Sequence, residues 1–125
     1  MDEHHQAIDA VASYFRVLSE PTRIRIMRVI CEEEKSVSQI VEELGGSQTN
    51  VSRHLGIMHR SGMLGRRKEG NQVYYRTADA AMVDLCRSVC KRISEREDGK
   101  APLRHALRRL IPQAKRDTKP KRSAV

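Results

Sequence analysis

With 125 residues and a formal net charge of +8, the chain is long enough for one folded domain and too short for two independent cores. Aromatic residues make up only 3% and tryptophan is absent, so the core must be built from aliphatic side chains, which favours packed helices and argues against an all-β protein. The chain has no apolar run long enough to span a membrane and no positively charged leader, so we expect the protein to stay in the cytoplasm.

Two amphipathic helices are predicted at the start of the chain. Apolar residues from Ile8 to Leu18 recur at helical spacing, which predicts a helix over residues 6–18. Ser19 is expected to end this helix and to cap the next one, whose first turn tolerates Pro21. The inner face of the second helix is predicted to carry Ile24, Met27, Ile30 and Cys31.

Two shorter helices separated by glycines are predicted next. Ser36 and Gln39 form a capping-box pattern that opens a helix ending at Leu44, before Gly45 and Gly46. Ser47 is expected to cap the following helix, and Gly62 suits its C-terminal exit. The inward positions of that helix are predicted to be Val51, Leu55 and Met58. This layout predicts a helix-turn-helix.

A β-hairpin and a long helix complete the predicted domain. The apolar period changes to two at Leu64, which predicts strands over 64–69 and 72–77 around a Gly70-Asn71 turn. Asp79 is expected to cap the long helix that follows. Its apolar stripe is predicted to comprise Met82, Cys86, Val89, Cys90 and Ile93. The predicted fold class is therefore mainly α with a small β-hairpin, a winged helix-turn-helix.

The end of the sequence is strongly basic. Leu103, Leu107, Leu110 and Ile111 predict one more short amphipathic helix, stopped by Pro112. We expect residues 113–125 to be a disordered basic tail. The predicted organisation is a DNA-binding and dimerisation domain over 1–98 and a basic C-terminal extension over 99–125.

The distribution of charge points to nucleic acid. Residues 100–125 hold nine Lys or Arg against one acid, which leaves residues 1–99 neutral overall. Within them, residues 47–76 carry a net charge of +5, so the remainder is acidic. A basic segment on an acidic body suits phosphate-backbone binding, because each neutralised phosphate releases counterions.

The basic segment coincides with the predicted helix-turn-helix and hairpin. Asn and Gln pair with adenine edges and Arg with guanine, and a wing follows the backbone or enters the minor groove. We therefore predict a double-stranded DNA surface within Ser47–Leu55 and Arg66–Arg76. Its predicted contact residues are Ser47, Gln48, Thr49, Asn50, Ser52, Arg53, His54, Arg66, Arg67, Lys68, Asn71 and Gln72.

Three segments make the chain resemble the ArsR/SmtB repressor family. They are residues 18–23 (LSEPTR), 47–55 (SQTNVSRHL) and 69–75 (EGNQVYY), and the resemblance spans roughly residues 8–93. It implies a winged-helix homodimer, paired through its first and last helices, that represses a palindromic operator and releases it when an inducer binds. A closed two-fold dimer would read two half-sites about one helical turn apart.

The chain departs from two metal-ligand patterns of that family. Residues 37–44 contain no Cys-x-Cys pair, and the predicted long helix offers Asp84, Cys86 and Cys90 but no histidine before His105. A zinc or nickel site is therefore disfavoured, and no cofactor is firmly indicated.

The cysteines are the candidate inducer site. Their odd number does not suit a disulfide scaffold, and Cys86 and Cys90 share one helical face while Cys31 is placed on the inner face of the second helix. Thiolates without imidazole suit trivalent arsenic or antimony as the inducer, or else sulfane sulfur or oxidant chemistry. Helical Cβ atoms four residues apart are about 5–6 Å apart, whereas a disulfide needs about 3.5–4.5 Å, so a bridging metalloid or polysulfide fits better than a direct bond.

The sequence leaves one other functional class open and argues against a second. One is an inducer-free dimeric repressor or architectural DNA-binding protein with inert cysteines, because free cysteine is often a small buried hydrophobe. The other, an enzyme, is not expected: the sequence has no Gly-rich phosphate loop, no paired carboxylates in an acidic pocket and no nucleophile beside a recognisable base.

Overall fold

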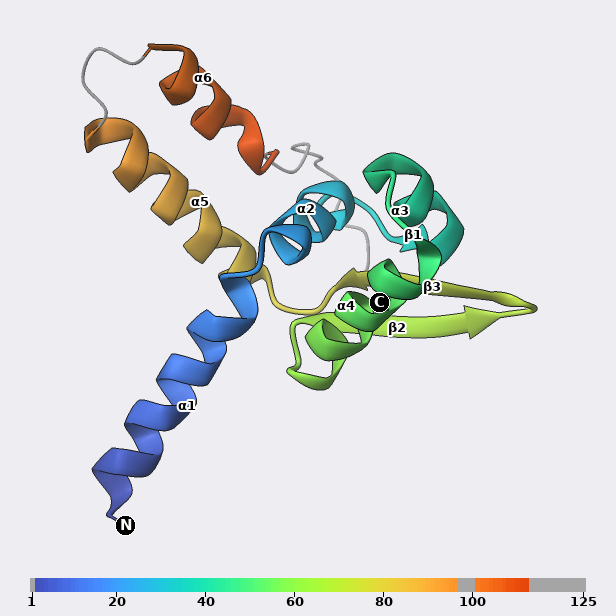
Figure 1. Ribbon diagram of the computed structural model, residues 1–125, viewed down its shortest axis with the longest axis horizontal. Helices are drawn as coiled ribbons and strands as arrows, with labels where there is room; N and C mark the ends of the chain where they lie inside the picture. The colour runs from blue at the N-terminus through green and yellow to red at the C-terminus, as the bar shows by residue number, and fades with distance from the viewer. Residues whose placement is uncertain (1, 97–100, 113–125) are drawn as a thin grey trace, which may run out of the picture.

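The computed structural model describes residues 2–96 and 101–112 and has a mainly helical body from which a two-stranded wing and one helix project (Figure 1). The helices are α1 (Glu3–Leu18), α2 (Pro21–Ile30), α3 (Val37–Leu44), α4 (Gln48–Arg60), α5 (Ala80–Arg96) and α6 (Ala101–Leu110). The strands are β1 (Lys35–Ser36), β2 (Leu64–Glu69) and β3 (Gln72–Thr77). The predicted winged helix-turn-helix fold is confirmed.

The core lies where α2, α3, α4 and the base of the sheet meet. Met27, Ile30, Val51, Leu55 and Met58 are buried there, as their helical spacing predicts. The other two inner-face residues predicted for this helix, Ile24 and Cys31, are only partly buried but pack against the core, and Cys31 is the C-cap of α2. Ile26, which was not predicted, is fully buried.

The N-cap of α2 is a different residue from the one that the sequence predicted. Ser19 is the C-cap of α1, and its hydroxyl donates to the carbonyl of Arg16 at 2.9 Å. The N-cap of α2 is Glu20, whose carboxylate accepts from the backbone N–H of Thr22 at 2.7 Å. Because Pro21 has no N–H to satisfy, a longer acidic side chain reaching Thr22 caps this helix well.

The turn between α3 and α4 forms as its local sequence predicts. The Ser36 hydroxyl accepts from the N–H of Gln39 at 3.1 Å, and the Gln39 side chain accepts from the N–H of Ser36 at 2.8 Å. Gly45 ends α3 with a left-handed φ of +80°, a conformation that favours glycine. Ser47 then caps α4, as predicted. The C-cap of α3 and the N-cap of α4 thus lie two residues apart and define the turn between the two helices.

The wing is a regular hairpin with one strand that the sequence did not reveal. Strands β2 and β3 pair antiparallel from Leu64 opposite Thr77 to Glu69 opposite Gln72, with both predicted ranges confirmed. The short strand β1 adds to β3 on the other side, so that Ser36 lies opposite Tyr74 and the strand order is β1-β3-β2. Residues of the α2–α3 connection are thereby fixed to the wing.

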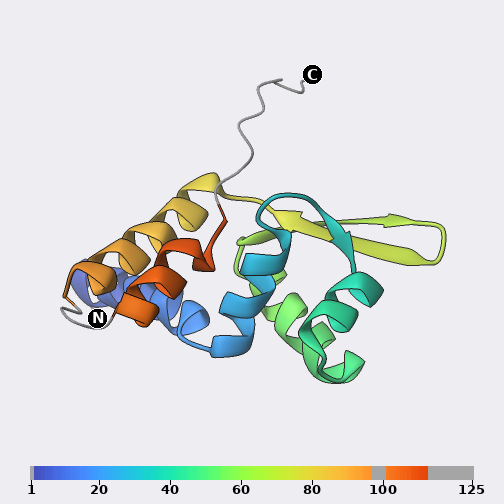
Figure 2. The same cartoon turned by 90° about the horizontal axis from the view of Figure 1, so that it is seen from above.

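The last two helices pack against each other as an antiparallel pair (Figure 2). Ile111, just after α6, is only 2% exposed and belongs to the core, and the Arg87 side chain on α5 donates to the carbonyls of Ile111 and Pro112. A domain boundary at residue 98 would thus cut between packed helices. Residues 113–125, predicted to be a disordered tail, lie outside the described residues.

Helix α1 projects from the body and buries none of its own side chains (Figure 1). Its apolar face is open: Ile8, Val11 and Phe15 are 66%, 57% and 53% exposed. Val89 and Ile93 on α5 are also exposed, so the predicted stripe of that helix divides between the core and the surface. Among residues 2–96 and 101–112, no helix is both long and apolar enough to cross a membrane.

Candidate nucleic-acid interface

The first turns of α4 present a row of polar side chains to solvent. Ser47 accepts the N–H of Asn50 through its hydroxyl at 3.1 Å, and Val51 and Leu55 hold the opposite face of the helix in the core. Five of the predicted DNA-contacting side chains on this helix are exposed, namely Gln48, Thr49, Asn50, Ser52 and Arg53. This is the arrangement that a recognition helix needs in a major groove.

One pair on this face is already ordered. The Arg53 guanidinium donates from Nη2 to the Asn50 side-chain oxygen at 2.9 Å, one helical turn away. Both residues keep further donors and acceptors for base edges. The bond restricts the long arginine side chain, so less rotamer entropy is lost when it binds.

A groove of about 560 Å³ separates the start of α4 from the wing. It is lined by seven of the predicted contact residues: Gln48, Ser52, Arg66, Arg67, Lys68, Asn71 and Gln72. The structure thus brings the two predicted halves of the DNA surface together. Outside the groove lie Thr49, Asn50 and Arg53 on the same helix, and Ser47, which caps it.

The side chain of Arg67 pairs with two carboxylates and links the wing to the α2–α3 connection. Its Nη2 and Nε atoms donate to one Glu34 carboxylate oxygen at 2.6 and 2.9 Å, its Nη1 donates to Glu69, and its guanidinium stands 4.5 Å from the centre of the Tyr74 ring. The hydrogen bond from Arg67 holds the pKa of Glu34 below its usual range. Two carboxylates neutralise this cation, so Arg67 ties the wing to the α2–α3 connection rather than offering a free charge.

Replacing Arg66 and Arg67 separately should distinguish a phosphate contact, expected for Arg66, from the structural link made by Arg67. No described acid forms an ion pair with Arg66, so R66A should weaken DNA binding uniformly across sequences and lower the slope of log K against log salt by about one. R67A should change that slope by clearly less, because its charge is already paired. Measuring DNA affinity at several salt concentrations gives the slope for each variant. Equal changes in slope for R66A and R67A would contradict these different roles.

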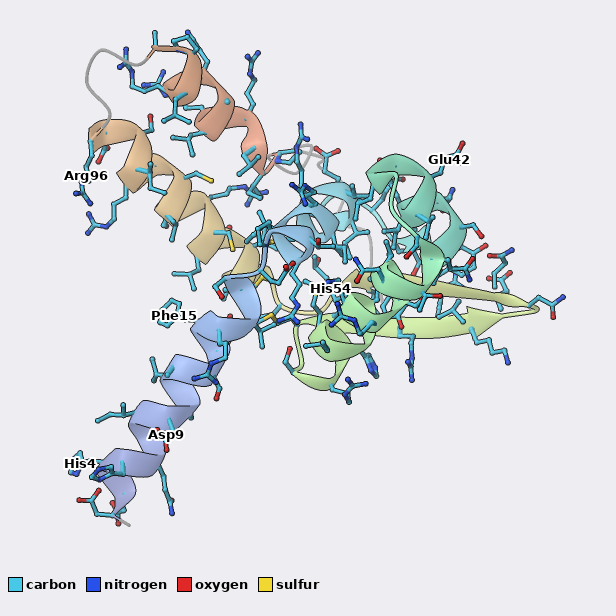
Figure 3. All side chains as sticks on the ribbon, in the orientation of Figure 1. His4, Asp9, Phe15, Glu42, His54 and Arg96 are labelled. Atoms are coloured by element: carbon cyan, nitrogen blue, oxygen red, sulfur yellow. The ribbon has the colours of Figure 1, made fainter. Side chains whose placement is uncertain are left out.

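His54 was predicted to contact DNA, and the structure places it elsewhere. Its side chain lies between α2 and α4 (Figure 3) and is only 3% exposed. Its Nδ1 atom accepts a hydrogen bond from Arg23 Nε at 3.1 Å. Burial lowers the pKa of His54, and the nearby Arg53 and Arg23 lower it further against the attraction of Glu20. The imidazole is therefore a neutral, internally bonded group and not an exposed base reader.

Two neighbours of the predicted surface were missed in the sequence. Ser38 on α3 lines the groove beside the wing. Exposed Arg25 on α2 borders a smaller recess of about 130 Å³ together with Asn50. Helical periodicity places Arg25 on the polar side of an amphipathic helix. That pattern alone does not show that α4 lies next to it.

The cysteines occupy two different places. Cys86 and Cys90 are 8% and 9% exposed, and both line an almost wholly apolar groove of about 440 Å³ between the end of α1 and helices α5 and α6. Cys31 lies at the end of α2, where its Sγ atom is 3.8 Å from the carbonyl oxygen of Pro112. Burial raises the pKa of all three thiols above the ordinary value.

A three-cysteine site is not assembled within one chain. Among residues 2–96 and 101–112, no three Cys, His, Asp or Glu side chains are grouped so as to hold a metal ion. Cys31 does not line the groove that holds Cys86 and Cys90. The described part of one chain therefore offers a pair of thiols, with Cys31 apart from them.

Comparison with known proteins agrees with this arrangement. Residues 20–64 match the model of the bacterial regulatory protein, arsR family. The helix-turn-helix transcriptional regulator Rv0081 of Mycobacterium tuberculosis, named as uncharacterized, is 32% identical over 75 residues, which cover 59% of this chain and 66% of the relative. A probable mercury resistance operon repressor of Streptomyces lividans is 34% identical over 77 residues, 62% of each chain. The chain thus spans just under two thirds of these relatives.

Solved structures share the fold. The crystal structure of Rv0081 superposes with a TM-score of 0.65 at 29% identity and covers 77% of this chain and 98% of that one. The transcriptional repressor BigR from Xylella fastidiosa superposes with a TM-score of 0.59 at 25% identity, covering 77% and 95%. These relatives are named as transcriptional regulators and not as enzymes, in agreement with the sequence-based expectation.

Proposed function

Because this chain belongs to the ArsR family of bacterial regulatory proteins, we propose that it is a transcriptional repressor that binds double-stranded operator DNA through α4 and the wing. The observation that carries the proposal is the groove between these two elements. It gathers Arg66 and Lys68 of the wing beside the exposed polar start of α4, on the most basic stretch of the first 99 residues. Such a surface pairs backbone contacts from the wing with base contacts from the helix.

We further propose that the chain acts as a homodimer on a palindromic operator. The exposed apolar side chains of α1 and α5 support this, because contiguous apolar patches on a soluble protein mark interaction surfaces. The exposed residues Ile8, Val11 and Phe15 lie on one side of α1 and need a partner. A two-fold dimer would present two copies of α4 to half-sites about one helical turn apart.

The direct test is a binding assay on the promoter beside the gene for this chain. The expected result is sequence-specific binding that weakens steeply as salt rises, with a DNase footprint showing two related half-sites. A scrambled duplex of equal length is the control. Equal affinity for both duplexes at every salt concentration would contradict a sequence-specific repressor.

For the inducer, the proposal is a soft, thiol-binding species that bridges Cys86 and Cys90. The pair shares one face of α5 and lines a single groove at the helix proposed for dimerisation. With trivalent arsenic, two thiols would displace two hydroxides of arsenous acid as water, forming two As–S bonds without a change of oxidation state. Trivalent antimony would react alike. With a polysulfide, one thiolate would attack a sulfane sulfur and break an S–S bond, forming a persulfide chain and releasing hydrosulfide. The second thiolate would then attack the inner sulfur of that chain and release a second hydrosulfide, so that the reduced polysulfide sulfur takes up the electrons and one sulfur atom bridges the two cysteines. Bridging would shift α5 and favour a dimer that binds DNA less well.

Titration of arsenite, antimonite and a polysulfide donor against the DNA complex tests this proposal. At least one should lower the affinity of the wild type by about tenfold or more, within the usual range of coupling between two sites. The variant C86A/C90A should bind DNA normally and lose this response. The matched control C31A should keep it, because Cys31 lies outside the groove.

The alternative is an inducer-free repressor or architectural protein with inert cysteines, and the burial of both thiols favours it. A raised thiol pKa leaves less thiolate to react near neutral pH. If DNA affinity is unchanged by every reagent, Cys86 and Cys90 are packing residues and this alternative holds.

A further inference from the structure

A single arginine bonds the last turn of α1 to the recognition helix. Arg23, in the first turns of α2, donates from Nη1 to the carbonyl of Val17 at 3.2 Å and from Nε to Nδ1 of His54 at 3.1 Å. Val17 belongs to α1 and His54 to α4, so one planar guanidinium spans three helices. The two bonds use separate donor atoms held in one plane, Nε and Nη1, whereas a lysine offers a single nitrogen as donor.

His54 in turn lies directly behind the base-reading face. Its Nε2 atom is 3.4 Å from Nη2 of Arg53, and the same Nη2 atom donates to Asn50. A third charged neighbour is Glu20, whose carboxylate oxygen is 3.9 Å from Nε2. Contacts thus run without a break from the end of α1, through Arg23 and His54, to the exposed Arg53 and Asn50 pair.

The protonation state of His54 follows from this geometry. A neutral imidazole has one acceptor nitrogen, and the shorter contact, with Arg23, assigns it to Nδ1. The proton is then on Nε2, facing Glu20. A protonated ring would have no acceptor for Arg23 and would place a positive charge beside both Arg23 and Arg53.

We propose that His54 is a positioning residue for DNA binding, which must stay neutral so that its bond to Arg23 holds the recognition helix in register with α1. The inference rests on the proposed DNA-binding function. Since α1 is also the helix proposed for dimerisation, this link is a route by which movement at the dimer interface reaches Arg53. It also predicts that acid weakens DNA binding through one buried side chain.

The direction of the pH effect follows from the pKa of His54. Burial, with Arg53 and Arg23, lowers the pKa in the folded protein below the ordinary value of 6.5, although Glu20 opposes this shift. The unfolded chain therefore takes up this proton at a higher pH than the folded one. The stabilising contribution is complete above the unfolded pKa of 6.5 and is lost as pH falls through the lower folded pKa.

Two variants separate positioning from bulk packing. In H54N, the side-chain oxygen stands as many bonds from the backbone as Nδ1 does, so it can accept from Arg23, yet it does not titrate. In H54L, the space is filled without an acceptor, which leaves the Arg23 Nε–H unpaired in a part-buried place. At pH 7.5 we expect H54N to bind operator within about threefold of the wild type, and H54L to lose about tenfold or more.

The pH profile is the readout that a merely structural role would not move. Between pH 7.5 and pH 5.0, wild-type affinity should fall by at least about threefold relative to H54N at matched salt. The other histidines are present in both proteins, so their contributions cancel in this ratio. Nitrogen-15 NMR of the imidazole should also show the Nε2–H tautomer at neutral pH.

The outcomes are distinct. Parallel pH profiles for wild type and H54N, or an Nδ1–H tautomer, would overturn this proposal while leaving DNA binding intact. A wild type that binds no operator at any pH would overturn the proposed function, and with it the positioning role. If H54L fails to fold, the comparison of wild type with H54N still decides.

Discussion

Replacing Arg53 with alanine is expected to lower the affinity for operator DNA by about 10- to 100-fold, because one good side-chain contact to a base contributes about 1–3 kcal/mol of discrimination. Arg53 is exposed on the polar face of α4 and is already oriented by its bond to Asn50. The loss should be larger for the operator than for a scrambled duplex, so R53A should also relax specificity. Fluorescence anisotropy with both duplexes measures it.

The matched control is R60A. Arg60 is an exposed arginine of the same helix, in its last turn, far along α4 from the polar start. R60A removes the same charge as R53A but leaves the polar start of α4 intact. It should therefore lower the affinities for the operator and for the scrambled duplex slightly and equally. If R60A and R53A lowered the affinity for the operator equally, this would show that α4 does not enter the DNA major groove by its N-terminal end.

Replacing Phe15 with aspartate is expected to convert a dimer into a monomer and, as a consequence, to abolish tight operator binding. Phe15 is 53% exposed in one chain and belongs to the apolar face of α1, so a charge there would be desolvated in any interface that covers it. A monomer reads one half-site only and loses the advantage of two linked contacts, which is commonly about 100-fold or more.

Analytical ultracentrifugation and the same anisotropy assay measure the two effects, and circular dichroism checks that F15D is folded. The control is S13D, which places an aspartate on the opposite, polar side of α1, where the Ser13 hydroxyl accepts from Arg16. S13D should remain dimeric. A dimeric F15D would show that α1 is not part of the interface.

The elements set by local sequence could be predicted, and the reasons are visible in particular residues. The capping box at Ser36 and Gln39 satisfies backbone donors within one turn of chain, and the hairpin is closed by neighbouring residues. By contrast, β1 has two residues and exists only because it pairs with β3, about forty positions along the chain. A segment that short carries no periodicity to detect.

The misplacement of His54 has a different cause. Val51, His54, Leu55 and Met58 are the buried residues of α4, and their spacing of three, one and three is that of a single helical face. The periodicity therefore contained the signal, but the residue type suggested a polar surface role. A histidine whose acceptor nitrogen has a fixed donor, here Arg23, can occupy a core face.

For the cysteines, helical spacing could place Cys86 and Cys90 together, and the structure does so. The position of Cys31 relative to that pair depended on how the end of α2 meets the chain near Pro112, which is a tertiary contact between residues 81 positions apart. No local pattern specifies such a contact.

Ser36 serves two neighbours at once, since it pairs with β3 of the wing and caps α3 of the helix-turn-helix. The wing and the helix-turn-helix are thus held as one unit, reinforced by the bond between Arg67 and Glu34. In evolutionary terms, substitutions in α5 or α6 can accumulate without altering these bonds. We therefore predict that a chimera that carries a relative's α5 on this body retains its DNA sequence preference.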